Sequence, residues 1–157
     1  MRVWRIASET SEYAADDLTG LGAYKTGGRW NSKNHCVLYC ADSPSLACLE
    51  TLVHMGAWNL PLRRYLVAID IPDMLWKARK SYHAKSLAND WDKVPVEPVS
   101  CQLGDVWLKR KQSVVLVVPS AIVPEDSVIL INPLHTDAHK IKAEKVRVWQ
   151  YDQRLIR

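Results

Sequence analysis

The sequence predicts an α+β fold, with a mixed or antiparallel β-sheet core and flanking helices. Apolar segments with strand character lie at both ends of the chain, and a segment with helical signals lies between them. Pro119, Pro124 and Pro133 divide the late apolar segments into short pieces, because proline cannot donate a main-chain hydrogen bond within a sheet. The length of 157 residues corresponds to a single domain, 1–157.

Six segments combine β-branched and aliphatic residues in the way that is typical of strands. They are residues 2–7, 36–40, 63–72, 113–121, 127–133 and 145–152, the last with a period-two pattern. The polar segment 10–24 is expected to form turns, and residues 73–104 are expected to form short helices and loops.

A helix is predicted over residues 43–55 (SPSLACLETLVHM). Ser43 suits the N-cap position, where its side chain accepts a hydrogen bond from an otherwise unpaired N–H group. Pro44 falls at the first helical position, which tolerates the missing N–H of proline.

Glu50 is the unusual residue of this helix. At about 100° per residue it points to the same side as Leu46, Leu49 and Val53, the expected apolar stripe. One explanation is structural: the carboxylate pairs with an arginine, or the face is only half buried. The other is functional, because a buried carboxylate is rarely kept without a use. The helical wheel leaves both explanations open.

Residues close to Glu50 in the sequence suit a ligand that combines phosphates, a flat ring and a sugar. Arg29 follows Gly27 and Gly28, which let the main chain approach a ligand closely, and a guanidinium binds phosphate through paired contacts. The ring of Tyr39 can stack on a base or a pyridine. The alternatives are a solvated surface arginine and a core tyrosine whose hydroxyl is satisfied.

Composition and charge narrow the class of protein only slightly. The formal net charge of +4 and the isoelectric point near 8.9 fit an anionic ligand, an acidic partner or nucleic acid. No apolar run approaches the ~18 to 20 residues of a membrane span. The N-terminal segment MRVWRIASET lacks the apolar core of a signal peptide, so the expected location is the cytoplasm.

The four cysteines, Cys36, Cys40, Cys48 and Cys101, are expected to be small, reduced core residues. Cys36 and Cys40 flank a short predicted strand, which separates them by ~13 Å. The ligands of a zinc ion must all lie within ~2.3 Å of it. A metal site is therefore not expected.

The segment 27–54, GGRWNSKNHCVLYCADSPSLACLETLVH, resembles the core of RES-domain toxins, the toxin component of bacterial RES–Xre toxin–antitoxin pairs. The pattern of that family is Arg-Trp-Asn after a glycine, a strand with a tyrosine, a Ser-Pro turn and a helix with a glutamate. The matching residues are Gly28, Arg29, Trp30, Asn31, Tyr39, Ser43, Pro44 and Glu50.

The resemblance extends over nearly the whole chain and is weakest in residues 73–104. It includes Arg5 in the opening VWRI and Ser120 in the late segment VPSAIVPEDSVILINPLH. Asn34 stands where the family often has a glycine, a small departure because asparagine also tolerates a left-handed turn.

This resemblance implies an ADP-ribosyltransferase-like fold and an enzyme that consumes NAD⁺ as a substrate, without a prosthetic group. RES toxins break the bond between nicotinamide and ribose, with water or phosphate as acceptor, and some modify a protein. An Xre-type antitoxin, a helix-turn-helix protein, is expected to cover the active site. Direct binding to nucleic acid or to a membrane is not expected. A homodimer or a larger assembly with the antitoxin is compatible with the resemblance.

The resemblance also gives each matching residue an expected role. Glu50 would accept a ribose hydroxyl and stabilise the cation that develops as nicotinamide leaves. Arg29 and Arg5 would bind the pyrophosphate or balance the charge of the site. Tyr39 would contact the nicotinamide half, and Ser120 would contribute a hydroxyl from the opposite wall. The expected catalytic residues are thus Glu50, Arg29, Tyr39 and Ser120, and the expected NAD⁺-binding residues are Arg5, Arg29, Trp30, Asn31 and Tyr39.

Three alternatives stay open. Transfer of ADP-ribose to a protein target would use the same site and would differ only in the acceptor. A catalytically inactive binding module is disfavoured by the intact set of Arg29, Tyr39 and Glu50. A ribonuclease toxin would draw on the basic segment 108–111 and on acid–base chemistry by His54, His83, His135 and His139.

Overall fold

A mixed β-sheet organises the fold in the computed structural model, which describes residues 1–54 and 63–156. Within these residues the strand order is β4-β5-β6-β2-β1-β3-β7. The pair β4 and β5 is parallel and the other neighbours are antiparallel, so the predicted α+β class with a mixed sheet is confirmed. The strands are β1 (Arg2–Ser8), β2 (Leu38–Ala41), β3 (Arg64–Asp70), β4 (Lys80–Ser81), β5 (Val115–Pro119), β6 (Ser127–Ile131) and β7 (Lys142–Trp149).

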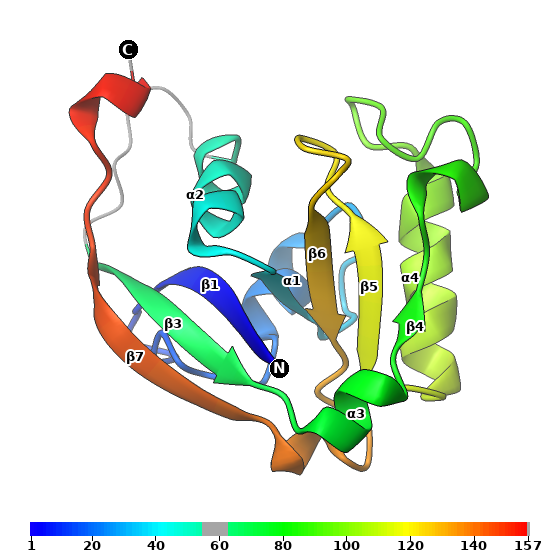
Figure 1. Cartoon of the computed structure of the whole chain (residues 1–157), viewed down its shortest axis with the longest axis horizontal. Coiled ribbons are helices and arrows are strands. Elements are labelled where there is room, and N and C mark those ends of the chain that lie inside the picture. Colours follow the sequence, from blue (N-terminus) through cyan, green and yellow to red (C-terminus); the bar gives the residue numbers. More distant parts are fainter. Residues whose placement is uncertain (55–62, 157) are drawn as a thin grey trace.

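Helices α2 (Pro44–Leu52) and α4 (Pro98–Arg110) pack on the same face of the sheet, and short helical turns connect some of the strands (Figure 1). No helix in the described part of the chain is both long and apolar enough to cross a membrane. The helices are α1 (Leu21–Thr26), α2 (Pro44–Leu52), α3 (Asp73–Lys77) and α4 (Pro98–Arg110), with 3₁₀ turns at Ala84–Ser86, Ala138–Lys140 and Gln153–Ile156.

The sheet consists of two halves that share few main-chain contacts. Strand β1 aligns with β3 along its whole length, but its register with β2 contains the single pair Trp4–Ala41. Helix α2 lies at this junction (Figure 1) and contacts both β1 and β2. The helix therefore bridges the two halves.

Side chains alternate between the two faces of the sheet. One face carries a large apolar cluster that includes Val3, Ile69 and Ile129 and is covered partly by α3 through Leu75. The other face carries two clusters. The first packs α4 against the strands and contains Trp30, Tyr39, Trp91, Trp107, Leu116 and Leu130, whereas the second lies under α2 and contains Ile6, Ala41, Leu46, Ala47 and Leu66.

The six predicted strand segments all contain strands, with ends displaced by up to about three residues. The main differences are helical. Helix α1 begins inside the segment 10–24, which was expected to form only turns, and α4 continues beyond residue 104 to Arg110. Pro98 stands at the start of α4, a position that proline favours.

The predicted start of α2 is confirmed. The N-cap Ser43 accepts a hydrogen bond from the Leu46 N–H at 3.1 Å, and Pro44 is the first helical residue. The helix ends at Leu52 rather than at residue 55, and that last expected residue lies outside the described part of the chain.

The predicted apolar stripe of α2 is wrong for two of its three residues. Leu46 is buried, but Leu49 and Val53 are 38% and 60% exposed, because the neighbouring elements cover the side of the helix that carries Ala47. At about 100° per residue, Glu50 projects between Leu46 and Ala47. The carboxylate therefore lies on the covered side, and it is half buried.

Candidate functional site

Glu50 and Ser120 meet between α2 and the end of β5, although 70 residues separate them. Ser120 is fully buried and its hydroxyl donates to Glu50 Oε1 at 2.7 Å. Ser120 Oγ in turn accepts hydrogen bonds from the N–H groups of Ile122 at 3.0 Å and Val123 at 3.2 Å. Because a hydroxyl has one proton and two lone pairs, these two amides leave the proton directed to the carboxylate.

The hydroxyl of Tyr39 is fully engaged with the Arg-Trp-Asn segment. It donates to Asn31 Oδ1 at 2.8 Å and accepts the Trp30 N–H at 2.9 Å. A Cβ atom at Gly28 would lie 2.7 Å from the Tyr39 oxygen, so glycine is needed at that position. Burial raises the pKa of Tyr39, against smaller opposing effects of the Trp30 N–H and the Arg29 charge, and the phenol therefore stays neutral at ordinary pH.

Trp30 and Asn31 are almost completely buried, at 2% and 1% exposure. The Trp30 ring stacks on Trp91, with 6.1 Å between the ring centroids. The Asn31 amide nitrogen donates to the carbonyl groups of Ala23, Ser32 and His35. Both side chains thus form the scaffold around Tyr39, and a direct contact of either with a ligand stays a prediction.

The Arg29 guanidinium is held by main-chain carbonyl groups. Its Nη1 donates to Trp91 O at 2.9 Å and to Lys93 O at 3.1 Å. No carboxylate in the described part of the chain lies within 4.0 Å of it. Its charge is therefore uncompensated there, which favours an anionic ligand.

Arg5 lies apart from these groups. It belongs to the same face of β1 as Val3, and its Nη1 donates to the Asp17 carbonyl at 3.3 Å. Arg5 is also close to Cys40, in the cluster on that face, because its charge opposes the rise that burial causes in the pKa of the Cys40 thiol. The structure brings Glu50 to Ser120 and Tyr39 to Asn31, but it places Arg5 on the opposite face of the sheet from α2.

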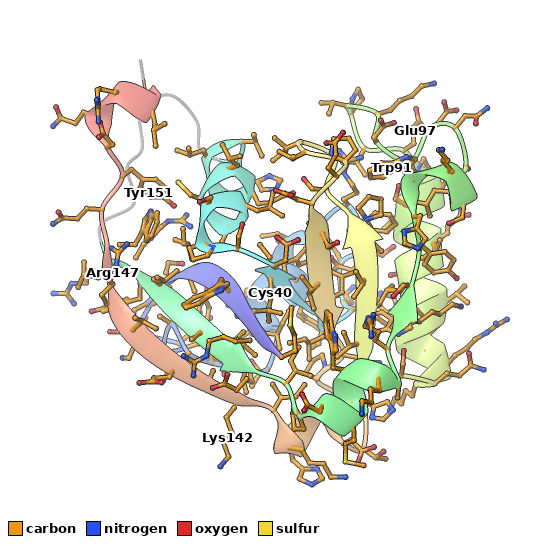
Figure 2. All side chains as sticks on the ribbon, in the orientation of Figure 1. Cys40, Trp91, Glu97, Lys142, Arg147 and Tyr151 are labelled. Carbon is orange, nitrogen blue, oxygen red and sulfur yellow. The ribbon has the colours of Figure 1, made fainter. Side chains whose placement is uncertain are left out.

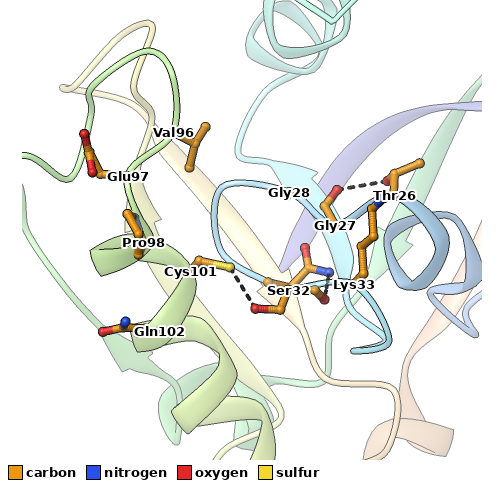
Figure 3. A pocket seen from close by; sticks show the side chains of 11 residues that line it. Thr26, Gly27, Gly28, Ser32, Lys33, Val96, Glu97, Pro98, Cys101 and Gln102 are labelled. Carbon is orange, nitrogen blue, oxygen red and sulfur yellow. Dashed lines mark hydrogen bonds between the residues drawn. The ribbon is translucent and has the colours of Figure 1, made fainter.

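A cavity of about 460 Å³ opens between the Gly27–Gly28 turn and the start of α4 (Figure 3). Gly28 and Asn31, the neighbours of the Tyr39 hydroxyl, contribute to its lining. Glu50 and Ser120 do not line it, nor do they line a second cavity of about 520 Å³ beside β4, β5 and β6. The first cavity thus adjoins the Tyr39 scaffold, and neither cavity is lined by Arg29 or Glu50.

Two residues of α4 outside the predicted site fix the Arg-Trp-Asn segment. Asp105 Oδ1 accepts the Ser32 N–H at 2.9 Å. A Cβ atom at Gly104 would lie 1.8 Å from the Trp30 carbonyl oxygen, so only glycine permits this close approach. A glycine inside a helix is a recognisable signal of such packing, whereas nothing in the sequence marks Asp105.

Three of the four cysteines lie in surroundings that disfavour the thiolate form. Burial raises the pKa of Cys40 to about 12 and also raises the pKa of Cys36 and Cys48. Metal ligation requires the thiolate. Within residues 1–54 and 63–156, no three His, Cys, Asp or Glu side chains are grouped as metal ligands.

Comparison with known proteins agrees with this architecture. A family model described as "RES domain" matches residues 2–154. A protein of Sphingobium sp. (strain YBL2) named "Prs ADP-ribosylating toxin" is 48% identical over 154 residues, which are 98% of this chain and 96% of that protein. A protein of Photorhabdus laumondii named "Toxin Res" is 35% identical over 94% of this chain and 93% of its own length.

Among solved structures, a chain of the Mycobacterium tuberculosis MbcT–MbcA toxin–antitoxin complex shares the fold, with a TM-score of 0.68. It is 17% identical, and the match covers 93% of this chain and 84% of that one. The family model spans almost the entire sequence and the Sphingobium relative aligns over nearly its whole length. The chain therefore belongs to the RES-domain family.

Proposed function

We propose that this chain is the toxin of a toxin–antitoxin pair and that it consumes NAD⁺ by breaking the bond between nicotinamide and ribose. Its membership of the RES-domain family and the toxin names of its relatives support the first part. The observation that carries the second is the half-buried Glu50 carboxylate, which the Ser120 hydroxyl holds at 2.7 Å.

Cleavage of this bond builds positive charge on the ribose as neutral nicotinamide leaves. A carboxylate that is already oriented stabilises this charge without a reorganisation cost. Ser120 supplies the orientation, because its proton is directed to Oε1 of Glu50. The second carboxylate oxygen of Glu50 is then available to a ribose hydroxyl.

Arg29 is the proposed anchor for the pyrophosphate. Its guanidinium has no carboxylate partner in the described residues, and its charge is near enough to the Tyr39 hydroxyl to oppose the rise of its pKa. Its Nη1 donates to the Trp91 and Lys93 carbonyls, which leaves Nε and Nη2 to form paired charge-assisted hydrogen bonds with phosphate. The Tyr39 ring, rather than its occupied hydroxyl, then packs against the nicotinamide half.

The direct test is release of nicotinamide from NAD⁺ by the purified chain and by its Glu50→Gln variant. Glutamine keeps the shape and removes the charge, so the rate is expected to fall by about 10²-fold or more, the scale of one lost transition-state contact. Glu144→Gln is the matched control, because Glu144 is exposed on β7. Near-normal release by the Glu50 variant would reject the proposed role.

A second candidate differs in the acceptor: ADP-ribose passes to a protein instead of water or phosphate. The observation that favours it is the name of the 48% identical relative, an ADP-ribosylating toxin. NAD⁺ labelled in the adenylate half distinguishes the two outcomes. Label on a protein band indicates transfer, whereas free ADP-ribose or its phosphorylated form indicates degradation.

The proposed partner is an antitoxin of the Xre type that covers the active site. The support is the resemblance of the sequence to RES toxins and the likeness of fold to a chain from a toxin–antitoxin complex. Addition of the protein encoded beside this chain should suppress nicotinamide release at equimolar concentration. Full activity of the stable complex would exclude coverage of the site.

A further inference from the structure

Three buried hydrogen-bond donors near the end of β7 have no partner in the described part of the chain. They are Nε of Arg64, Nε1 of Trp149 and the hydroxyl of Tyr151. Buried polar groups are paired in the great majority of cases, and an unpaired one costs about 1–3 kcal/mol. Three together indicate that something outside the described residues pairs with them.

The three donors belong to one cluster. Arg64 and Trp149 are directly opposite each other on β3 and β7, so their side chains lie on the same face of the sheet. The Trp149 and Tyr151 rings are in edge contact, 6.1 Å apart. Burial raises the pKa of Tyr151, and the nearby Thr51 side chain and Arg64 guanidinium oppose that effect. Figure 2 shows Tyr151 between the end of β7 and α2.

Positive charge in this cluster is also uncompensated. In residues 1–54 and 63–156, neither Arg64 nor Arg147 has a carboxylate within 4.0 Å, although Arg2 and Arg154 have one. The Arg147 guanidinium lies over the Trp149 ring, 4.6 Å from its centroid. Segment 55–62 (MGAWNLPL), which joins α2 to β3, contains no Asp or Glu and cannot supply a carboxylate.

We propose that Arg64, Trp149 and Tyr151 form a binding site for an oxyanion of the phosphate class, separate from the proposed NAD⁺ site. Guanidinium and indole nitrogens can only donate, and the tyrosine hydroxyl has a free proton. A phosphate group offers several acceptor oxygens and negative charge, so one group satisfies all three donors. A water molecule or a carbonyl group could accept a hydrogen bond from one of these donors but would not neutralise the positive charge of Arg64.

The position of the site couples it to the helix that carries Glu50. Tyr151 and Trp149 pack in the same cluster as Cys48 and Leu52 of α2, and Tyr151 is also close to Thr51. A bound oxyanion thus ties the last turn of α2 to β3 and β7. Its binding should stabilise the folded chain in proportion to its occupancy.

The test is calorimetric titration of the whole chain with inorganic phosphate at constant ionic strength, and in a second series with adenosine monophosphate. Arg64→Gln and Tyr151→Phe should each weaken phosphate binding about ten- to hundredfold, the effect of one lost hydrogen bond to a charged group. Binding of both probes assigns the site to phosphate monoesters, and binding of inorganic phosphate alone assigns it to the free ion.

Two control variants locate the bound phosphate. Arg154→Gln removes an exposed arginine already paired with Asp152 and should leave the affinity unchanged. Arg29→Ala removes the proposed pyrophosphate anchor, so it should weaken phosphate binding at the NAD⁺ site and leave binding at the Arg64 site unchanged. The proposal is overturned if phosphate does not bind, if the Arg64 and Tyr151 variants bind it as the parent does, or if Arg29→Ala abolishes all binding. Tyr151→Phe keeps the ring, and its melting temperature without phosphate checks that the chain is folded.

Discussion

Tyr39→Phe separates a scaffold role of the hydroxyl from a chemical one. The substitution keeps the ring and removes two hydrogen bonds, one to Asn31 Oδ1 at 2.8 Å and one from the Trp30 N–H at 2.9 Å. Both partners belong to residues with 2% exposure or less, so water cannot easily replace the hydroxyl. Each orphaned buried group costs about 1–3 kcal/mol, and the expected loss in the free energy of unfolding is therefore about 2–6 kcal/mol.

Urea unfolding measures this loss, and NAD⁺ turnover by the same variant measures the functional effect. We expect kcat to fall by less than about tenfold and KM to rise, because the loosened segment carries Arg29. Tyr24→Phe is the matched control, since Tyr24 is 38% exposed on α1 and surface substitutions usually change stability by about 0.5 kcal/mol or less. A Tyr39 variant with unchanged stability and abolished kcat would refute the scaffold role and assign proton chemistry to the hydroxyl.

Three further predictions concern other parts of the molecule. Ser120→Ala removes the donor to the carboxylate and the acceptor of two amides, so urea unfolding should show a loss of about 2–4 kcal/mol together with lower turnover; a stable and fully active variant would contradict this role. Gly104→Ala should cost at least about 3 kcal/mol, because the new Cβ would lie 1.8 Å from the Trp30 carbonyl oxygen; a variant as stable as the parent would show that α4 is not so close. Arg2 lowers the pKa of Asp70 from its ordinary 3.8, so its stabilisation is present above about pH 4 and is lost as the pH falls through the lowered value. The stability difference between the parent and Arg2→Gln at pH 7 should therefore vanish in strong acid, and a difference that persists there would exclude the ion pair as its source.

Local signals explain which elements the sequence predicted well. The start of α2 follows from Ser43 and Pro44 alone, since an N-cap and a proline at the first position act within one turn. The run of apolar and β-branched residues that predicted β3 is also a local signal. Helix α1 is short, contains Gly22 and has no side-chain cap, so its propensity is weak and no local signal predicts it.

Information that depends on the tertiary arrangement was not predictable. The wheel of α2 placed Glu50 on a stripe with Leu49 and Val53, but those residues are exposed because no described element covers that side of the helix. The contact of Glu50 with Ser120 depends on the end of β5, which is 70 residues away. Sequence patterns single out candidate residues, and the packing of distant strands decides which of them meet.

The single register pair between β1 and β2 has a mechanical consequence. Because few main-chain hydrogen bonds join β1 to β2, the side-chain packing beneath α2 holds the two halves of the sheet together. Tyr39 belongs to one half, whereas Glu50 belongs to α2 itself. A protein that bound both halves and tilted one against the other would thus change the distance between Tyr39 and Glu50 without contacting either residue.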